Sequence, residues 1–317
     1  MLRRFLTFAM FASICIGTSS TSTASTIRAK YQPVETRVAS SVTSPKPPAA
    51  YSPPLADFVP YNNLAGESTI SDCDAYGSTD EIRAPVPCVE GDVSASRTIV
   101  LVGDSNVGNW APGLSAGLSK SKYKLDVFSF AGCPTPDITY VEADYIGVTP
   151  SSCNEWHVSV LKAIVKLSPV AIVTASSGVG PQYTQKAWDD GYKTLFAKAT
   201  GDRSSVRRIV IGTSPYFNTP PPTCLSRNPA APLRCAMSTG TKTIVGAYYT
   251  YASRDSDIAK ASGATLISTS SLFCFDKICP AEVAGTVTFA DNDHVTTAYS
   301  HEISTPLTNA ILAALKS

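Results

Sequence analysis

The stretch Thr98-Ile-Val-Leu-Val-Gly-Asp-Ser105 decides how the rest of this chain is interpreted. Its four apolar residues, 99–102, are mostly β-branched, which predicts a buried strand that ends at Gly103. Apolar residues then recur at helical spacing over 107–120. A serine between such a strand and helix stands where open α/β sheets bind ligands, beside helix amides that stabilise negative charge. The same Asp-Ser pair can instead serve only as a turn and a helix cap.

Composition narrows the classes of function. The chain has 317 residues, of which 44% are hydrophobic, and a formal net charge of +1. This length suffices for one sizeable α/β domain with appended segments. A nearly neutral chain without a basic stripe argues against a nucleic-acid-binding protein.

The amino-terminal residues have the pattern of an export signal. Arg3 and Arg4 precede an apolar run over residues 5–17, and Ala24 offers a small-residue cleavage site. The run is shorter than the ~20 residues of a membrane-spanning helix, although an uncleaved membrane anchor stays open as an alternative. We therefore expect residues 1–26 to be a signal peptide and the protein to be exported to the cell envelope or the extracellular space.

Three further segments follow the expected signal. Residues 27–56 are rich in Pro, Ser, Thr and Ala, which indicates a flexible linker without a core of its own. Residues 57–97 carry few periodic apolar runs and two cysteines, so we expect a disulfide-stapled extension that lies on the main domain. Residues 98–317 are the expected main domain.

Strands and helices alternate from Thr98 onward, which predicts an α/β fold of three layers. The expected strands after the first are Lys124–Phe130, Val170–Thr174, Arg208–Ile211 and Thr265–Ser268. The expected helices are Val107–Lys120, Asn154–Leu167, Thr184–Thr200, Thr243–Ala261 and Ala298–Leu315, and Gly212–Gly240 is an expected Pro-rich loop. This pattern predicts a doubly wound, five-stranded parallel sheet of flavodoxin-like type, with helices on both faces and disulfide-stapled loops.

Cysteine usage agrees with export, because eight of the nine cysteines lie beyond the expected signal. Consecutive cysteines fall within single expected loops, which favours pairing between neighbours. The expected disulfides are Cys73–Cys88, Cys133–Cys153, Cys224–Cys235 and Cys274–Cys279. Zinc binding is the alternative, but the sequence has no CxxC spacing and three histidines in all, so we expect neither a metal nor a cofactor.

A second polar cluster, Phe289-Ala-Asp-Asn-Asp-His-Val-Thr-Thr-Ala298, follows the fifth expected strand. In a doubly wound sheet this loop emerges at the same edge as Ser105, where His294 can act as general base for the serine hydroxyl. Asp291 can fold back to hold the other imidazole nitrogen. Asp293 is the alternative carboxylate, although a residue adjacent to the histidine more naturally points away from its ring. His294 could also cap the last helix or meet solvent.

The other two histidines fit structural roles better. His157 follows Trp156 on an expected helix face, which favours packing. His301 lies inside the last expected helix, away from the strand edge, where we expect a surface residue.

Several further segments carry a resemblance to a known family. They are, in chain order, Val102-Gly-Asp-Ser105, Ala131-Gly-Cys-Pro134, Cys153-Asn-Glu-Trp156, Trp188 with Gly191, Pro222-Thr-Cys-Leu-Ser226, Phe273-Cys274 with Cys279-Pro280, and Asp291 with His294-Val-Thr296. From about Asp57 to its end, the chain resembles the SGNH-hydrolase family. It is most similar to the SGNH domain at the carboxyl end of bacterial envelope acyltransferases of the acyltransferase-3 type.

The resemblance implies a catalytic triad of Ser105, His294 and Asp291. It also implies that the backbone amides of Ser105 and Gly132 face the acyl oxyanion. Gly132 could alternatively serve only the turn beside Cys133.

Two positions depart from the family pattern. Asn106 stands where the fused domains commonly have histidine, so contacts to the acyl acceptor are expected to differ. The family's third oxyanion donor is an asparagine after the third strand, and residues 174–178 contain none. We expect Ser176 or Ser177 to substitute for it.

The resemblance implies an exported serine esterase or O-acyltransferase that acts on small acyl groups, expected to be acetyl, of a cell-envelope glycan. The reaction would pass through an acyl-serine intermediate. Here the domain is expected to be free-standing, and a separate membrane acyltransferase is an expected partner. The alternative is a catalytically silent module of the same fold that binds a glycan or acts as a scaffold.

Overall fold

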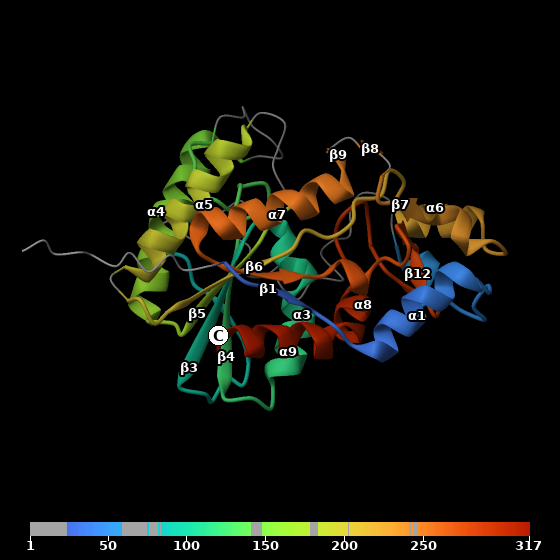
Figure 1. Ribbon diagram of the computed structural model, residues 1–317, viewed down its shortest axis with the longest axis horizontal. Helices are drawn as coiled ribbons and strands as arrows, with labels where there is room; N and C mark the ends of the chain where they lie inside the picture. The colour runs from blue at the N-terminus through green and yellow to red at the C-terminus, as the bar shows by residue number, and fades with distance from the viewer. Residues whose placement is uncertain are drawn as a thin grey trace, which may run out of the picture.

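The computed structural model describes residues 24–58, 75, 82, 84–140, 148–177, 183–201, 203–240, 242–243 and 246–317. These residues include a seven-stranded sheet with the order β1-β10-β6-β5-β3-β4-β2 (Figure 1). Its strands are β1 (Thr26–Arg28), β2 (Cys88–Gly91), β3 (Arg97–Gly103), β4 (Tyr123–Ser129), β5 (Ala171–Ala175), β6 (Arg207–Ile211) and β10 (Thr265–Ser268). Short two-stranded ribbons join β7 (Met237–Ser238) to β11 (Ile278–Cys279), β8 (Lys242–Thr243) to β9 (Gly246–Ala247), and β12 (Glu282–Val283) to β13 (Thr286–Val287).

Helices surround the sheet. They are α1 (Gln32–Thr43), α3 (Ala111–Leu118), α4 (Pro150–Leu167), α5 (Gln185–Thr200), α6 (Pro221–Arg227), α7 (Tyr248–Ser262), α8 (Thr297–Glu302) and α9 (Ser304–Ala314). The described residues also form the short 3-10 helices η1 (Leu55–Asp57), η3 (Ser105–Asn109), η4 (Pro232–Cys235) and η5 (Ser270–Leu272). Within the described ranges, no helix is both long and apolar enough to cross a membrane.

The five expected parallel strands are confirmed as β3, β4, β5, β6 and β10. Strand β3 lies between β4 and β5, so the chain first adds a strand on one side and then crosses back to the other. This order is the expected flavodoxin-like one, and the reversal leaves a crevice position beyond the carboxyl end of β3. The fold class inferred from the sequence is correct.

Alternate residues of β3 face two separate cores, as expected for a strand buried on both faces. Ile99 and Leu101 belong to the core under α3, α8 and α9, whereas Val100 and Val102 belong to the core under α4, α5 and α7. Figure 1 shows α4, α5 and α7 on one side of the sheet and α9 on the other. The three layers hold the carboxyl end of β3 rigidly at the middle of the sheet.

The segment expected to be a linker, residues 27–56, is part of the packed fold. Strand β1 pairs in parallel with β10 and extends the sheet. Helix α1 buries Val34 and Val38 against the core, and Ser52 exchanges main-chain hydrogen bonds of 2.9 Å with the β12–β13 ribbon. The expectation was wrong for two reasons. The two valines of α1, at positions i and i+4, lie among small polar residues that dominate the composition. Strand β1 has only three residues, which is too short to show a periodic pattern.

Three other boundaries differ from expectation, and proline explains two of them. The expected helix 107–120 is divided into η3 and α3, because Pro112 lacks the N–H that would continue a helix through Gly108. The last expected helix is divided into α8 and α9, since Pro306 cannot donate to Glu302. The expected stapled extension, 57–97, supplies β2 as an antiparallel edge strand beside β4. The sheet therefore crosses the expected domain boundary at residue 98.

Disulfides staple the loops of this domain. The structure contains the expected Cys133–Cys153, Cys224–Cys235 and Cys274–Cys279 bonds. Cys88 is also disulfide-bonded, and its expected partner Cys73 lies outside the described residues. The expected signal peptide also lies outside them, apart from residues 24–26. Its expected boundary at residue 26 was too late, because Thr26 begins β1 and pairs with Leu266 of β10.

Candidate active site

Ser105 lies at the carboxyl end of β3, where 3-10 helix η3 begins. The strand can end so close to β5 because residue 103 is glycine, and a Cβ there would lie 2.1 Å from the carbonyl oxygen of Ala175. Asp104 caps η3, since its Oδ1 accepts the N–H of Asn106 at 2.9 Å. Ser105 is thereby fixed at the topological switch point of the sheet, beside the amino end of a helical turn.

The loop 289–295, between β13 and α8, forms its own tight turn. A β-bridge joins Phe289 to Val295, and the N–H of Ala290 donates to the carbonyl of His294 at 2.8 Å. Inside the turn, Oδ1 of Asp291 accepts the N–H groups of Asp293 at 2.9 Å and His294 at 2.8 Å. The loop therefore holds the Asp291 carboxylate beneath the imidazole three residues later.

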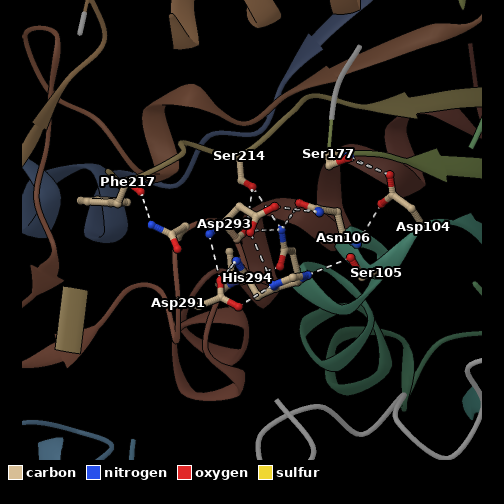
Figure 2. Close-up of polar contacts among 12 residues, drawn as sticks. Asp104, Ser105, Asn106, Ser177, Ser214, Phe217, Asp291, Asp293 and His294 are labelled. Atoms are coloured by element: carbon tan, nitrogen blue, oxygen red, sulfur yellow. Dashed lines mark hydrogen bonds and ion pairs between the residues drawn. The ribbon is translucent and has the colours of Figure 1, made fainter. Parts of the chain in front are cut away.

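Ser105, His294 and Asp291 form one hydrogen-bonded chain (Figure 2). The Oγ of Ser105 lies 2.8 Å from Nε2 of His294, and Nδ1 of His294 lies 2.7 Å from Oδ2 of Asp291. A carboxylate on Nδ1 holds the proton there and leaves Nε2 able to accept the proton of the serine. The structure thus brings together the three residues that the sequence selected from opposite ends of the domain.

Charge around His294 favours its protonated form. Burial opposes protonation, but the carboxylates of Asp293, Asp291 and Asp104 outweigh it and raise the pKa of His294 to about 9. Burial would also raise the pKa of Asp291, but the bond and charge of His294 hold that pKa below its usual value. The pair is therefore an imidazole whose positive form is stabilised by an ionised carboxylate.

Asp293 does not point away from the ring, contrary to the sequence argument. Its Oδ1 lies 3.5 Å from Nδ1 of His294, and its Oδ2 accepts Nδ2 of Asn106 at 3.4 Å. The tight turn made by Asp291 swings the neighbouring carboxylate back toward the imidazole. Asp291, at 2.7 Å, remains the carboxylate in hydrogen-bonding contact, and Asp293 is a second anion beside the same ring.

Gly132 occupies the turn that follows β4. Its φ of +79° is the left-handed conformation that favours glycine. The turn is anchored on both sides, because Phe130 donates its N–H to the carbonyl of Gly103 at 3.1 Å and Cys133 is bonded to Cys153 in α4. This anchoring suits a fixed backbone donor near Ser105, although it also fits the alternative role of a turn.

Ser176 and Ser177 do not offer themselves as the third oxyanion donor. Both hydroxyls donate to Oδ2 of Asp104 at 3.1 Å, and the N–H of Ser177 donates to the same atom at 2.9 Å. Asp104 is buried, and its burial raises the pKa of its carboxyl. The two serines therefore tie the end of β5 to residues 104–106, the candidate nucleophile turn. Residue 178, the last of the candidate stretch, lies outside the described residues.

Two buried asparagines lie in the centre of the site: Asn106, which departs from the family pattern, and Asn109, which sequence reasoning missed. Asn106 and Asn109 are only 2% and 1% exposed, and both bond to the loop that carries His294. Their signal was present in the sequence as two asparagines in an otherwise apolar segment. Reading that segment only by its apolar spacing left Asn109 without a role.

The remaining histidines lie apart from Ser105. His157 is buried, its Nε2 lies 2.8 Å from the carbonyl oxygen of Pro134, and burial lowers its pKa. His301 is exposed on α8. Both placements agree with structural roles.

Among the residues that the structure describes, two clusters of side chains have the composition of metal ligands. One joins His157 to Cys133 and Cys153, whose sulfurs are bonded to each other and so are not thiolates. The other is Asp291, Asp293 and His294, whose Nδ1 is engaged with Asp291. In the second cluster, the hydrogen bonds of His294 to Asp291 and to Ser105 suit proton transfer along the Ser105–His294–Asp291 chain.

Comparison with known proteins places the chain in a family. A family described as "SGNH domain (fused to AT3 domains)" matches residues 72–308. The chain belongs to this SGNH domain family. The match begins after the strand and helix formed by β1 and α1. No curated protein sequence matches the chain.

Two solved structures are similar to this SGNH domain to different degrees. The periplasmic domain of a lipopolysaccharide acetyltransferase from Salmonella ser. Paratyphi A superimposes with a TM-score of 0.55 and 18% identity, over 68% of this chain and 84% of that one. A carbohydrate acetylesterase from Sinorhizobium meliloti has a TM-score of 0.44 and 10% identity, over 68% of this chain and 99% of its own. The first similarity shows a common fold.

Proposed function

We propose that this SGNH domain is a serine-dependent O-acyl esterase or O-acyltransferase. One observation supports the proposal above all: Ser105 Oγ, His294 and Asp291 are linked by hydrogen bonds of 2.8 and 2.7 Å. A free serine hydroxyl is a weak nucleophile, and an oriented imidazole within hydrogen-bonding distance is what activates it. The Oγ is therefore the atom that attacks an acyl carbonyl.

The reaction proceeds in two halves. As Ser105 Oγ bonds to the acyl carbon, its proton passes to Nε2 of His294, and the carbonyl oxygen becomes an anion. The backbone N–H groups of Ser105 and Gly132 stabilise that anion. When the bond from the acyl carbon to the departing oxygen breaks, His294 returns the proton to the leaving alcohol. Water or a sugar hydroxyl then attacks the acyl-serine by the same route and frees Ser105.

We further propose acetyl as the acyl group and a cell-envelope glycan as the substrate. The family's fusion to AT3 domains and the lipopolysaccharide acetyltransferase domain of the same fold support this choice. Disulfides in three loops suit an oxidising compartment, so the residues before Thr26 act as an export signal. A separate membrane acyltransferase supplies the acyl group when the reaction is a transfer.

Hydrolysis of p-nitrophenyl acetate tests the enzyme proposal. We expect Ser105→Ala to lower kcat/KM by at least about 10³-fold, because the nucleophile is removed. Ser119→Ala changes an exposed serine on the far end of α3 and serves as the matched control. A mass increase of one acetyl group on Ser105 after rapid quenching would locate the intermediate. Equal rates for wild type and Ser105→Ala would instead favour the catalytically silent glycan-binding or scaffolding module.

A further inference from the structure

Asn109 holds the main chain on both sides of His294. Its Oδ1 accepts the N–H of Val295 at 2.7 Å, and its Nδ2 donates to the carbonyl of Asp293 at 3.0 Å. One side-chain amide thus bonds to the residue before the histidine and to the residue after it. The loop between them cannot rotate about the histidine without breaking one of these two bonds.

The same amide reaches two other segments of the site. Nδ2 lies 2.9 Å from Oδ1 of Asn106 and 3.1 Å from Oγ of Ser214, in the loop after β6. Figure 2 shows Ser214, Asn106 and Asp293 gathered on one side of His294. The carbonyl of Asn109 accepts a hydrogen bond from the hydroxyl of Ser300, in α8, with 2.9 Å between the two oxygens. Asn109 is therefore a junction between the nucleophile turn and the histidine loop.

Asn109 also shares its element with the nucleophile. It ends η3, the same short 3-10 helix that Ser105 begins, and four residues of 3-10 helix rise only about 8 Å. His294 comes from a loop 189 positions away in the chain. The distance between the two reacting groups therefore depends on contacts between η3 and that loop, and Asn109 supplies the buried ones that bracket the histidine.

We propose that Asn109 is a positioning residue, whose amide keeps the imidazole of His294 within proton-transfer distance of Ser105. The proposal deepens the proposed function and rests on it. Proton transfer requires about 2.6–3.2 Å between the heavy atoms, and a misplacement of about 1 Å can cost about 10²-fold in rate. An amide fits the role, because its Oδ1 accepts from Val295 while its Nδ2 donates to Asp293.

The test compares Asn109→Leu, which removes both groups, with Asn109→Asp, which keeps the acceptor but loses the donor. In p-nitrophenyl acetate hydrolysis we expect Asn109→Leu to lower kcat about 10²-fold with KM changed less than about 2-fold. We expect Asn109→Asp to lower kcat less and to move the ascending limb of the pH profile to higher pH, because it adds an anion near His294. Asn228→Leu is the control, since it removes an amide that bonds only within and beside α6, to Cys224 and Cys235.

A second readout does not require catalysis. In 15N NMR spectra, Ser105→Ala should change the Nε2 shift of His294 in the wild-type background and leave it unchanged in the Asn109→Leu background. If the wild type hydrolyses no ester, the proposed function fails, while this comparison still decides the role of Asn109. If Asn109→Leu keeps the kcat, the pH profile and the Nε2 response of the wild type, the proposal is overturned. If Asn109→Leu does not fold, the same measurements on Asn109→Asp decide, and an unchanged kcat and pH limb there overturns it.

Discussion

Two carboxylates face a single imidazole, and they set the pH at which His294 can accept a proton. Asp291 bonds to Nδ1 at 2.7 Å and Asp293 lies 3.5 Å from the same atom. Asp104, beneath the nucleophile turn, adds a third anion at longer range. Because the raised pKa of His294 is about 9, the imidazole is mostly protonated at neutral pH. The base form needed by Ser105 therefore grows as the pH rises through that value.

Asp293→Asn should move the pH profile of kcat/KM toward acid. Removing this negative charge removes the strongest influence that raises the pKa of His294, so the limb should shift from about 9 toward the ordinary imidazole value near 6.5. Asp291→Asn should instead lower kcat by roughly 10⁴-fold across the profile, because it favours the wrong tautomer. Stopped assays with an acetyl ester from pH 5 to about 10, with NMR titration of the ring, measure both.

Asp190→Asn, which changes an exposed carboxylate on α5 with 60% side-chain exposure, provides the control for general charge effects. A profile for Asp293→Asn identical to that of the wild type would show that Asp293 does not act on the ring.

At the residue scale, the sequence could select the proposed reacting residues but not their surroundings. Ser105, Asp291 and His294 could be selected because a strand end and a late polar loop must share one sheet edge in this topology. The hydrogen bond from Ser176 to Asp104 could not be predicted, because no feature of the sequence links Ser176 to a residue 72 positions away. The role of Asn109 could not be predicted for the same reason, because the role of a buried asparagine depends on hydrogen-bond partners that lie far away in the sequence.

At the scale of single elements, predictability followed length and apolar content. Strands β3, β5 and β6 were evident because they are apolar runs rich in β-branched residues and buried on both faces. Strand β4 was evident from its alternation of polar and apolar residues. Strand β2 was not, since it is a four-residue edge strand with half-exposed residues. Helices α8 and α9 read as one helix because their apolar faces continue through Ile303, and only Pro306 marks the break.

The contact between α3 and α8 depends on a missing side chain. A Cβ on Gly113 would lie 2.3 Å from the carbonyl oxygen of Ser300. Alanine would gain about 1 kcal/mol in helix propensity, but the clash with backbone outweighs it. We expect Gly113→Ala to lower the free energy of unfolding by about 2–3 kcal/mol, measured by urea denaturation.

Gly240→Ala is the matched control, since the nearest atom to a Cβ there is Oγ of Ser238 at 4.0 Å. Equal stability of the two variants would mean that α3 and α8 can separate at little cost. Because the carbonyl of Asn109 also bonds to Ser300, Gly113→Ala should lower esterase activity together with stability.

At the scale of the whole molecule, the amino-terminal segment belongs to the core. Val34 and Val38 are 0% and 1% exposed in α1, beside a strand that lengthens the sheet. The double variant Val34→Ala/Val38→Ala should lose on the order of 2–5 kcal/mol in the free energy of unfolding, because two cavities open in one cluster.

The control for this prediction is Val86→Ala/Val93→Ala, whose valines are 78% and 66% exposed. It should leave the urea midpoint nearly unchanged. If both pairs behave alike, the segment contributes nothing to stability and the linker interpretation would regain support.

Pairing between the two ends of the chain has a consequence for how the protein is made. Strand β1 pairs with β10, so Thr26 can take its place in the sheet only after Leu266 has been synthesised. Ser105 likewise can form its hydrogen bond to His294 only after the chain has grown by a further 189 residues. A ribosome or a translocation channel delivers the chain from its amino end, so a partly synthesised chain has neither a closed sheet nor a proton acceptor for its serine. The proposed acyl chemistry therefore requires that residue 294 has been synthesised, and until then the unpaired edge of the sheet is exposed to aggregation.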